Sequence, residues 1–155
     1  MQNPPRMVAL GDVHLTRSTP RNVSDDLARL FESHPGARIV IAGDLFDLSA
    51  DLPKQPIRHA IDEVFAIHSG AKAALGRHLI HGGELWLVSG NHDAALGFGE
   101  FRSALENALD LPGEARSRLR TTPWFFREGH LHIEHGHLFD PDNAPTHPLV
   151  LGEAS

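Results

Sequence analysis

Runs of apolar residues alternate with helix-like patterns along the chain, and each run has the length of a buried strand. The helix-like segments repeat apolar residues every three or four positions, as a helix does when one of its faces is buried. Strands are expected at residues 6–10, 37–43 and 84–90, helices at 23–31, 57–75 and 101–109, and a hairpin of two strands at 124–136 that turns near Glu128 and Gly129. This alternation predicts a largely parallel α/β sheet with right-handed crossovers.

Polar side chains follow the expected strands, each time where an apolar run ends. In chain order these are Asp12 and His14, then Asp44 and Asp47, then Asn91, His92 and Asp93, and finally His135 and His137. Because the carboxyl ends of parallel strands meet along one edge of a sheet, we expect these groups to converge there. A glycine stands at or beside each turn, and glycine permits positive φ and a close approach to an ion or phosphate.

Carboxylates, imidazoles and an amide at one place suit a pair of divalent metal ions. One carboxylate can bridge two ions, and such a pair holds a phosphoryl group and deprotonates a water molecule for in-line attack. Aspartates alone would favour Mg²⁺ or Ca²⁺. The mixture of imidazole and carboxylate indicates Mn²⁺, Fe or Zn²⁺, and the geometry of the site would decide among them. Of the three, we expect Mn²⁺ first.

The composition narrows the chemistry and the partners. The 155 residues suit one domain, and the chain has twelve histidines and a net charge of −6. It has no cysteine, so disulfides are excluded and metals must bind through nitrogen and oxygen. The negative charge argues against binding to nucleic acid. No signal peptide or membrane-spanning run is recognisable, and we expect a soluble cytoplasmic protein.

Each polar segment also has a purely structural interpretation. The aspartates could serve in turns, and the Asn91–Asp93 segment could cap the helix that follows it. We interpret His130, His132, His135 and His137 as alternating along one strand, so that all four share a face. For His130 and His132 a solvated face is favoured, with Leu131 and Ile133 packing beneath it.

The ordered segments "GDVH", "GDLFD" and "GNHD" resemble those of the calcineurin-like metallophosphoesterases, and "EHGHLFDPDN" resembles a later block of several bacterial members. The resemblance spans about residues 8–143. It implies an αββα sandwich around a dinuclear metal centre that hydrolyses a phosphomonoester, a phosphodiester or a pyrophosphate bond.

The resemblance also implies a role for each matching residue. Asp12 and His14 would bind the first metal, Asp44 would bridge both metals, and Asn91 and His135 would bind the second. Asn91 and His92 would also contact the substrate phosphate. His92 would be the acid that stabilises the leaving group, oriented by Asp47, and His137 is an additional candidate ligand.

The family pattern ends with a G-H-x-H segment on a later strand, and we recognise no such segment in this chain. We therefore expect residues 1–155 to be one domain that forms the N-terminal portion of a longer catalytic domain and lacks part of the second sheet. A less favoured interpretation is that His137 or His147 replaces the missing ligands.

Several functions fit these residues. The favoured one is hydrolysis of a small phosphoester. DNA exonucleases and UDP-diacylglucosamine pyrophosphohydrolases share similar segments, but the acidic charge disfavours the former, and no apolar helical cap of the latter is recognisable. A metal-binding or interaction module that has lost catalysis is an alternative from another class, and a histidine-rich metal store ranks last.

Overall fold

A computed structural model describes residues 6–48, 50, 56–97 and 99–142. Its centre is a four-stranded sheet in the order β1-β2-β3-β4, with all neighbours parallel. The strands are β1 (Met7–Leu10), β2 (Arg38–Ala42), β3 (Glu84–Val88) and β4 (Leu119–Thr122). The predicted α/β class and parallel sheet are confirmed.

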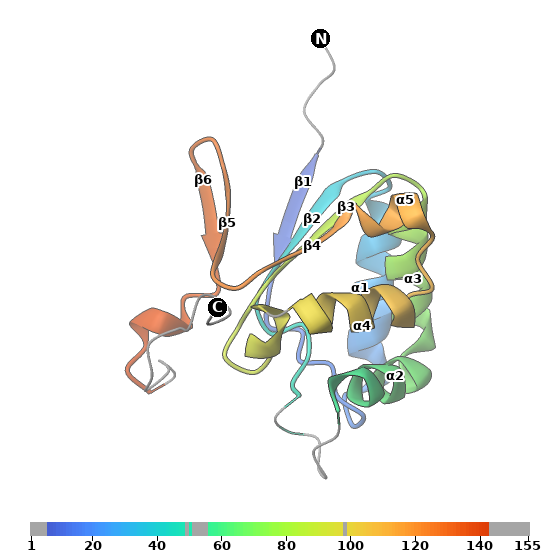
Figure 1. The fold of residues 1–155 in the computed structure, drawn as a ribbon, viewed down its shortest axis with the longest axis horizontal. Coiled ribbons are helices and arrows are strands. Elements are labelled where there is room, and N and C mark those ends of the chain that lie inside the picture. Colours follow the sequence, from blue (N-terminus) through green and yellow to red (C-terminus); the bar gives the residue numbers. More distant parts are fainter. Residues whose placement is uncertain (1–5, 49, 51–55, 98, 143–155) are drawn as a thin grey trace.

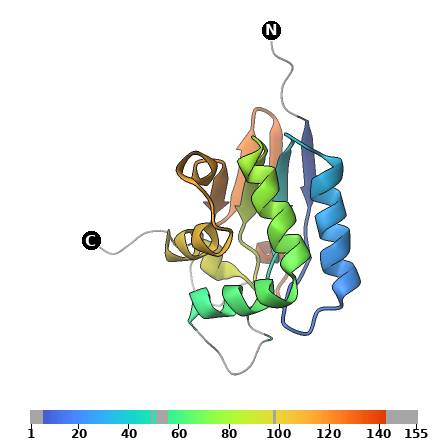
Figure 2. The same ribbon diagram turned by 90° about the vertical axis from the view of Figure 1, so that its right-hand side faces the viewer.

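The helices form one layer on one face of this sheet (Figures 1 and 2). They are α1 (Arg21–Ser33), α2 (Ile57–Ile67), α3 (Ser69–Ile80), α4 (Gly99–Ala108) and the short α5 (Gly113–Arg116). Because the strand order follows the chain order, right-handed crossovers bring every connecting helix to the same face. Among the described residues no helix combines the length and apolarity needed to cross a membrane.

The main core lies between the helices and the sheet. Strand side chains alternate between the two faces, so Ile39, Ile41, Leu85 and Leu87 point into this core whereas Val40 and Val88 point away from it. Phe46, which follows β2, packs edge-to-face against Phe65 of α2 and Phe101 of α4. The core therefore extends to the carboxyl end of the sheet.

The opposite face of the sheet is covered by an antiparallel hairpin of β5 (Phe125–Glu128) and β6 (Leu131–Glu134), as predicted. Its contact with the sheet is a small cluster in which Phe126 packs against Val40 and Val88. Arg38 of β2 contacts both Glu84 of β3 and Glu128 of β5. In the described residues, the two inner layers of the expected αββα sandwich are therefore the central sheet and this hairpin, with helices over the central sheet only.

The structure departs from the predicted elements at two places. The single helix expected at 57–75 is two helices, and the break is at His68 (φ −102°, ψ 48°) rather than at Gly70 or Gly76. Strand β4 and helix α5 were not predicted, since the sequence Leu119–Thr122 has one apolar residue and an arginine. The pattern of residues in β4 does not indicate a strand, and the segment is a strand because it pairs with β3.

Candidate metal centre

The polar segments meet around a cavity of about 360 Å³. Its lining residues follow the carboxyl ends of β1, β2, β3 and β6, and these strands are labelled in Figure 1. It is lined by Asp12, His14, Asp44, Asn91, His92, His135, Gly136, His137 and Asp140. Every residue predicted as a metal ligand or phosphate contact lines this cavity, and Asp47 lies directly behind it in contact with His92. The predicted convergence is therefore confirmed, whereas the role of each residue stays a prediction.

The loops after β1 and β2 hold each other in place. The His14 N–H donates to the Asp44 carbonyl (2.8 Å), and the Leu15 N–H donates to the Leu45 carbonyl (2.9 Å). Asp12, His14 and Asp44 have positive φ values of 56°, 50° and 53°. A positive φ is unfavourable for a residue with a side chain, so the surrounding structure must hold it in place. Residues held in this way are concentrated at functional sites.

Asp93 organises the backbone beneath the cavity, a role that sequence reasoning missed. It is fully buried (0% exposed). Its carboxylate accepts hydrogen bonds from the N–H groups of Gly90 (2.8 Å), Leu45 (2.8 Å), Asp44 (3.2 Å) and Phe46 (3.3 Å). Burial raises the Asp93 pKa above its usual range, and the N–H donors of Gly90 and Phe46 oppose that shift. Asp93 thus joins the loop after β3 to the loop after β2.

Asp44 is the most buried acidic group that faces the cavity (2% exposed). Its Oδ1 accepts the backbone N–H of His92 (3.0 Å). Its Oδ2 lies 3.6 Å from His14 Nε2 and 3.2 Å from His135 Nε2. One carboxylate oxygen therefore stands between imidazoles from the two sides of the cavity, as a bridging ligand requires.

Gly90 serves this arrangement by the absence of a side chain. A Cβ at Gly90 would overlap the Asp44 carboxylate and crowd the Asp44 backbone N. Of the two properties expected of the turn glycines, Gly90 therefore shows the close approach and not a positive φ. Around the cavity the positive φ values belong to Asp12, His14 and Asp44, together with Gly43 at 86° and Gly136 at 88°.

His135 is fixed in a tautomer that leaves one ring nitrogen free to bind a metal. Its Nδ1–H donates to the Ala42 carbonyl (3.0 Å), so Nε2 of the neutral ring carries a lone pair. That nitrogen lies 3.0 Å from Asn91 Oδ1 and 3.2 Å from Asp44 Oδ2. Ligand atoms around an ion at about 2.1 Å are about 3 Å apart, so these acceptors fit a divalent cation.

A second group of candidate ligands lies on the other side of Asp44. His14 Nε2 is 3.8 Å from Asp12 Oδ1 and 3.6 Å from Asp44 Oδ2, and the three side chains offer ligand atoms within 4.8 Å of one another. Asp12 is exposed and His14 is half-buried. This group and the His135 group share Asp44, so the residues fit two neighbouring ions.

His92 and Asp47 form a pair beside these groups. His92 Nδ1 lies 3.0 Å from Asp47 Oδ1. Asp47 Oδ2 lies 3.9 Å from His14 Nδ1, and the rings of His14 and His92 meet edge-to-face at 5.0 Å. His14, Asp47 and His92 also satisfy the distance criterion for a metal group, so geometry alone does not separate a ligand from an acid here.

The prediction that four histidines share one strand face is wrong. Strand β6 ends at Glu134, and His130 lies in the hairpin turn, at the end of the hairpin far from the cavity. The expectation that the chain has no G-H-x-H segment is also wrong, because residues 129–132 have this sequence. Its two histidines, His130 and His132, are exposed and do not line the cavity. Leu131 is also exposed (44%), so the expected packing beneath these histidines is absent at that position.

His137 and Asp140 lie on the wall formed by the short helix η2 (His137–Phe139). His137 was a predicted additional ligand and Asp140 was missed, because it lies outside any strand-end motif. The His137 ring is 5.2 Å from the His135 ring, and its buried Nδ1 has no hydrogen-bond partner among the residues that the structure describes. Burial, and then the charge of His135, lower the His137 pKa, while Asp44 and Glu134 raise it. His147 lies outside the described residues.

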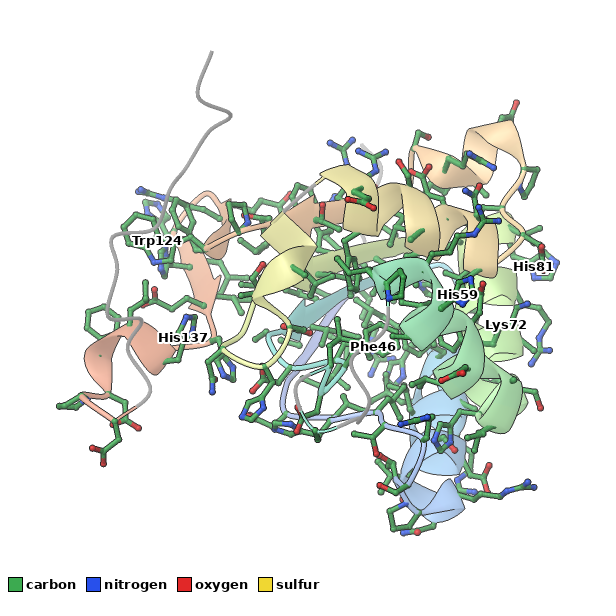
Figure 3. All side chains as sticks on the ribbon, turned by 60° about the horizontal axis from the view of Figure 1, so that its bottom comes forward. Phe46, His59, Lys72, His81, Trp124 and His137 are labelled. Carbon is green, nitrogen blue, oxygen red and sulfur yellow. The ribbon has the colours of Figure 1, made fainter. Side chains whose placement is uncertain are left out.

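The remaining described histidines are remote from the cavity. Figure 3 shows His81 on the far side of the helical layer from His137. His68 and His78 are buried and donate to backbone carbonyls. The histidine content therefore divides into a cluster at the cavity and scattered structural or surface positions.

Comparison with curated proteins and with solved structures finds no match. A family model described as calcineurin-like phosphoesterase matches residues 5–151. The match covers nearly the whole chain and includes every loop that reaches the cavity. The chain therefore belongs to the calcineurin-like phosphoesterases, a family whose activity is metal-dependent phosphoester hydrolysis.

Proposed function

We propose that the cavity is the dinuclear metal site of a hydrolase acting on small phosphoesters. The observation that carries the proposal is the position of His135 Nε2, which lies 3.0 Å from Asn91 Oδ1 and 3.2 Å from Asp44 Oδ2. When the ring is neutral its proton is on Nδ1, so none of these three atoms carries a proton to share. Such a cluster of lone pairs is stabilised by a cation.

In this proposal Asp12, His14 and Asp44 hold the first metal, and Asp44, Asn91 and His135 hold the second. The two ions, when bound, supply charge for the phosphoryl group and a hydroxide for attack. Mn²⁺ suits the mixed oxygen and nitrogen ligands best, with Fe and Zn²⁺ as alternatives. His137 is the candidate for an additional ligand from the η2 wall.

Asn91 and His92 would bind the substrate phosphate. The Asn91 amide has donors left for a phosphate oxygen when its Oδ1 faces the metal. Asp47 accepts the Nδ1–H of His92 and stabilises the protonated ring, and Nε2–H then donates a proton to the leaving oxygen. The bond from Asp47 also fixes the ring orientation.

The bond that is hydrolysed would be a phosphomonoester, a phosphodiester or a pyrophosphate of a small molecule. The chain has a net charge of −6, and this does not favour a nucleic-acid substrate. Exonuclease-type and UDP-diacylglucosamine pyrophosphohydrolase-type activities remain the alternatives within the family. The alternative from another class is a metal-binding module without catalysis.

Metal content tests the site. After loading with Mn²⁺ and desalting, the wild-type protein is expected to retain two equivalents, and Asp44→Asn is expected to lose both because the bridge serves both ions. Unchanged metal content in Asp44→Asn would refute the bridging assignment.

Hydrolysis of bis-p-nitrophenyl phosphate with Mn²⁺ separates the enzyme from the non-catalytic module. His92→Asn is expected to retain metal and to lose on the order of 10²–10⁴ in rate, as removal of a positioned acid does. A wild-type rate no greater than that of His92→Asn, with two metals bound, would favour the non-catalytic module.

A further inference from the structure

We infer that His68, at the break between α2 and α3, is a positioning residue that holds His14 in its strained backbone conformation through Thr16 and Thr19. The consequence for metal binding rests on the proposed role of His14 as a ligand. His68 lies outside every segment that carried the prediction of the metal centre.

A continuous set of hydrogen bonds joins His68 to His14. His68 Nε2–H donates to the Thr16 carbonyl (2.8 Å). The Thr16 N–H donates to Thr19 Oγ1 (2.8 Å), and the two threonine hydroxyls lie 2.9 Å apart. The Thr19 hydroxyl in turn donates to the His14 carbonyl (2.8 Å). Each bond falls in the normal range for its type.

The last of these bonds acts on the strained residue. His14 has φ 50°, a conformation that costs an ordinary side chain free energy unless its surroundings enforce it. The His14 N–H is held by the Asp44 carbonyl and the His14 carbonyl is held by Thr19. With both backbone groups held, the His14 ring keeps its Nε2 toward Asp12 and Asp44.

The His68 end of the network is rigid. His68 is 2% exposed, and Thr16 is 7% exposed. The His68 backbone N–H donates to the Val64 carbonyl at the end of α2, and its carbonyl accepts the Lys72 N–H within α3. The helix break is therefore what turns this ring toward the loop. Loss of the ring donor would leave the Thr16 carbonyl without its buried partner.

His78 is a matched control within the same protein. It is 6% exposed, and its Nε2–H donates to the Ala37 carbonyl (3.0 Å), just before β2 begins. The cavity is at the other end of that strand. His68→Leu and His78→Leu therefore remove the same kind of buried bond, and only the first is connected to the metal centre.

The first experiment follows amide hydrogen exchange of Thr16 and Ser18 in the metal-free protein, since both amides donate to hydroxyls of this network. Exchange at both is expected to accelerate at least about tenfold in His68→Leu and to stay unchanged in His78→Leu. His68→Gln, which keeps a donor at the position of Nε2, is expected to restore protection. Equal exchange in the two leucine variants would overturn the inference.

The second experiment measures Mn²⁺ affinity by electron paramagnetic resonance on the same proteins. His68→Leu is expected to weaken binding about 10- to 100-fold, in the range found for residues that orient a ligand, and His68→Gln is expected to recover most of it. If His68→Leu does not fold, Thr19→Val removes the hydroxyl next to His14 and is expected to give the same loss.

The two readouts separate the inference from the proposed function. A wild-type protein that binds no Mn²⁺ would refute the metal site, and the exchange data would still decide whether His68 holds the loop. Strong Mn²⁺ binding that is equal in His68→Leu and His78→Leu would refute the role of His68 and leave the metal site intact.

Discussion

The two faces of the central sheet support the candidate metal centre to different degrees. On one face, the helices enclose a large core that reaches Leu45, Phe46 and Leu96 in the loops bearing the site. On the other face, the fully buried apolar cluster consists of Val40, Val88 and Phe126. The first metal group and Asp93 belong to loops supported by the large core, whereas His135 and His137 follow a hairpin held by the small one.

This difference indicates that the two proposed metal positions are unequal. The ligands of the first are fixed by backbone bonds between neighbouring loops and by the buried Asp93. His135 is placed by its bond to the Ala42 carbonyl and by the packing of its ring over Gly43, where a Cβ would overlap it. We therefore expect the second position to be lost first when the fold is weakened.

The largest effect is expected from Asp93→Ala, which removes the acceptor shared by the loops after β2 and β3. The buried backbone N–H groups of Asp44, Leu45, Phe46 and Gly90 would lose their carboxyl acceptor, at a cost of at least about 3 kcal/mol in the free energy of unfolding. Urea denaturation measures this loss. Asp93→Asn retains one acceptor oxygen, so its free energy of unfolding is expected to lie between those of wild type and Asp93→Ala. Equal stability of Asp93→Ala and wild type would show that the loops do not depend on this residue.

Phe126→Ala tests the comparison directly. Removing this buried ring is expected to weaken the packing of the hairpin against the sheet by about 3 kcal/mol. Mn²⁺ stoichiometry is then expected to fall from two to one. Phe101→Ala, at a buried ring in the large core, is the matched variant. It is expected to lower the overall Tm while folded protein retains both ions. If Mn²⁺ stoichiometry falls from two to one in both variants, the two faces of the sheet do not support separate metal positions.

Gly90→Ala is expected to cost about 2 kcal/mol and to impair both metal positions, because the added methyl group overlaps Asp44. The Asp44 backbone lies close to the same point, so a change of rotamer does not remove the overlap. Gly70→Ala is the control, since a Cβ at that helical position meets nothing within 4 Å. It is expected to be neutral or slightly stabilising. Thermal melts and metal analysis distinguish the two variants.

The site was predictable from the sequence because its residues follow strands. The alternation of elements implied a parallel sheet, and a parallel sheet brings its strand ends to one edge, which places Asp12, Asp44 and Asn91 together without knowledge of any side-chain contact. Asp93 could not be assigned in this way. A helix cap and an internal acceptor for neighbouring loops have the same appearance in sequence.

The missed features depend on tertiary contacts. Gly70 and Gly76 weaken the helical pattern near the break but do not locate it at His68. The His68 ring bonds to a loop 52 positions away in the chain, which no local pattern shows. Strand β4 exists because β3 pairs with it. The four histidines from His130 to His137 could not have shared one strand face in any case, because His132 and His135 are three positions apart and a strand alternates its faces with a period of two.

The smallest effect is expected from His78, which lies on the helical side of the sheet. Its titration makes the free energy of unfolding depend on pH. Burial lowers the pKa of His78, opposed by its backbone hydrogen bonds. Because the folded-state pKa lies below the unfolded value of about 6.5, His78 contributes stability above that pH, and the contribution is lost as the pH falls toward the folded-state pKa. Replacing His78 with Gln is expected to reduce the difference in unfolding free energy between about pH 7.5 and pH 5.5 by an amount on the order of 1 kcal/mol. Urea denaturation of the metal-free proteins at both pH values measures it, and the other titrating groups cancel in the comparison with wild type. The same acid sensitivity in both proteins would place its origin elsewhere, and the hairpin side, with His137, would be the next place to substitute.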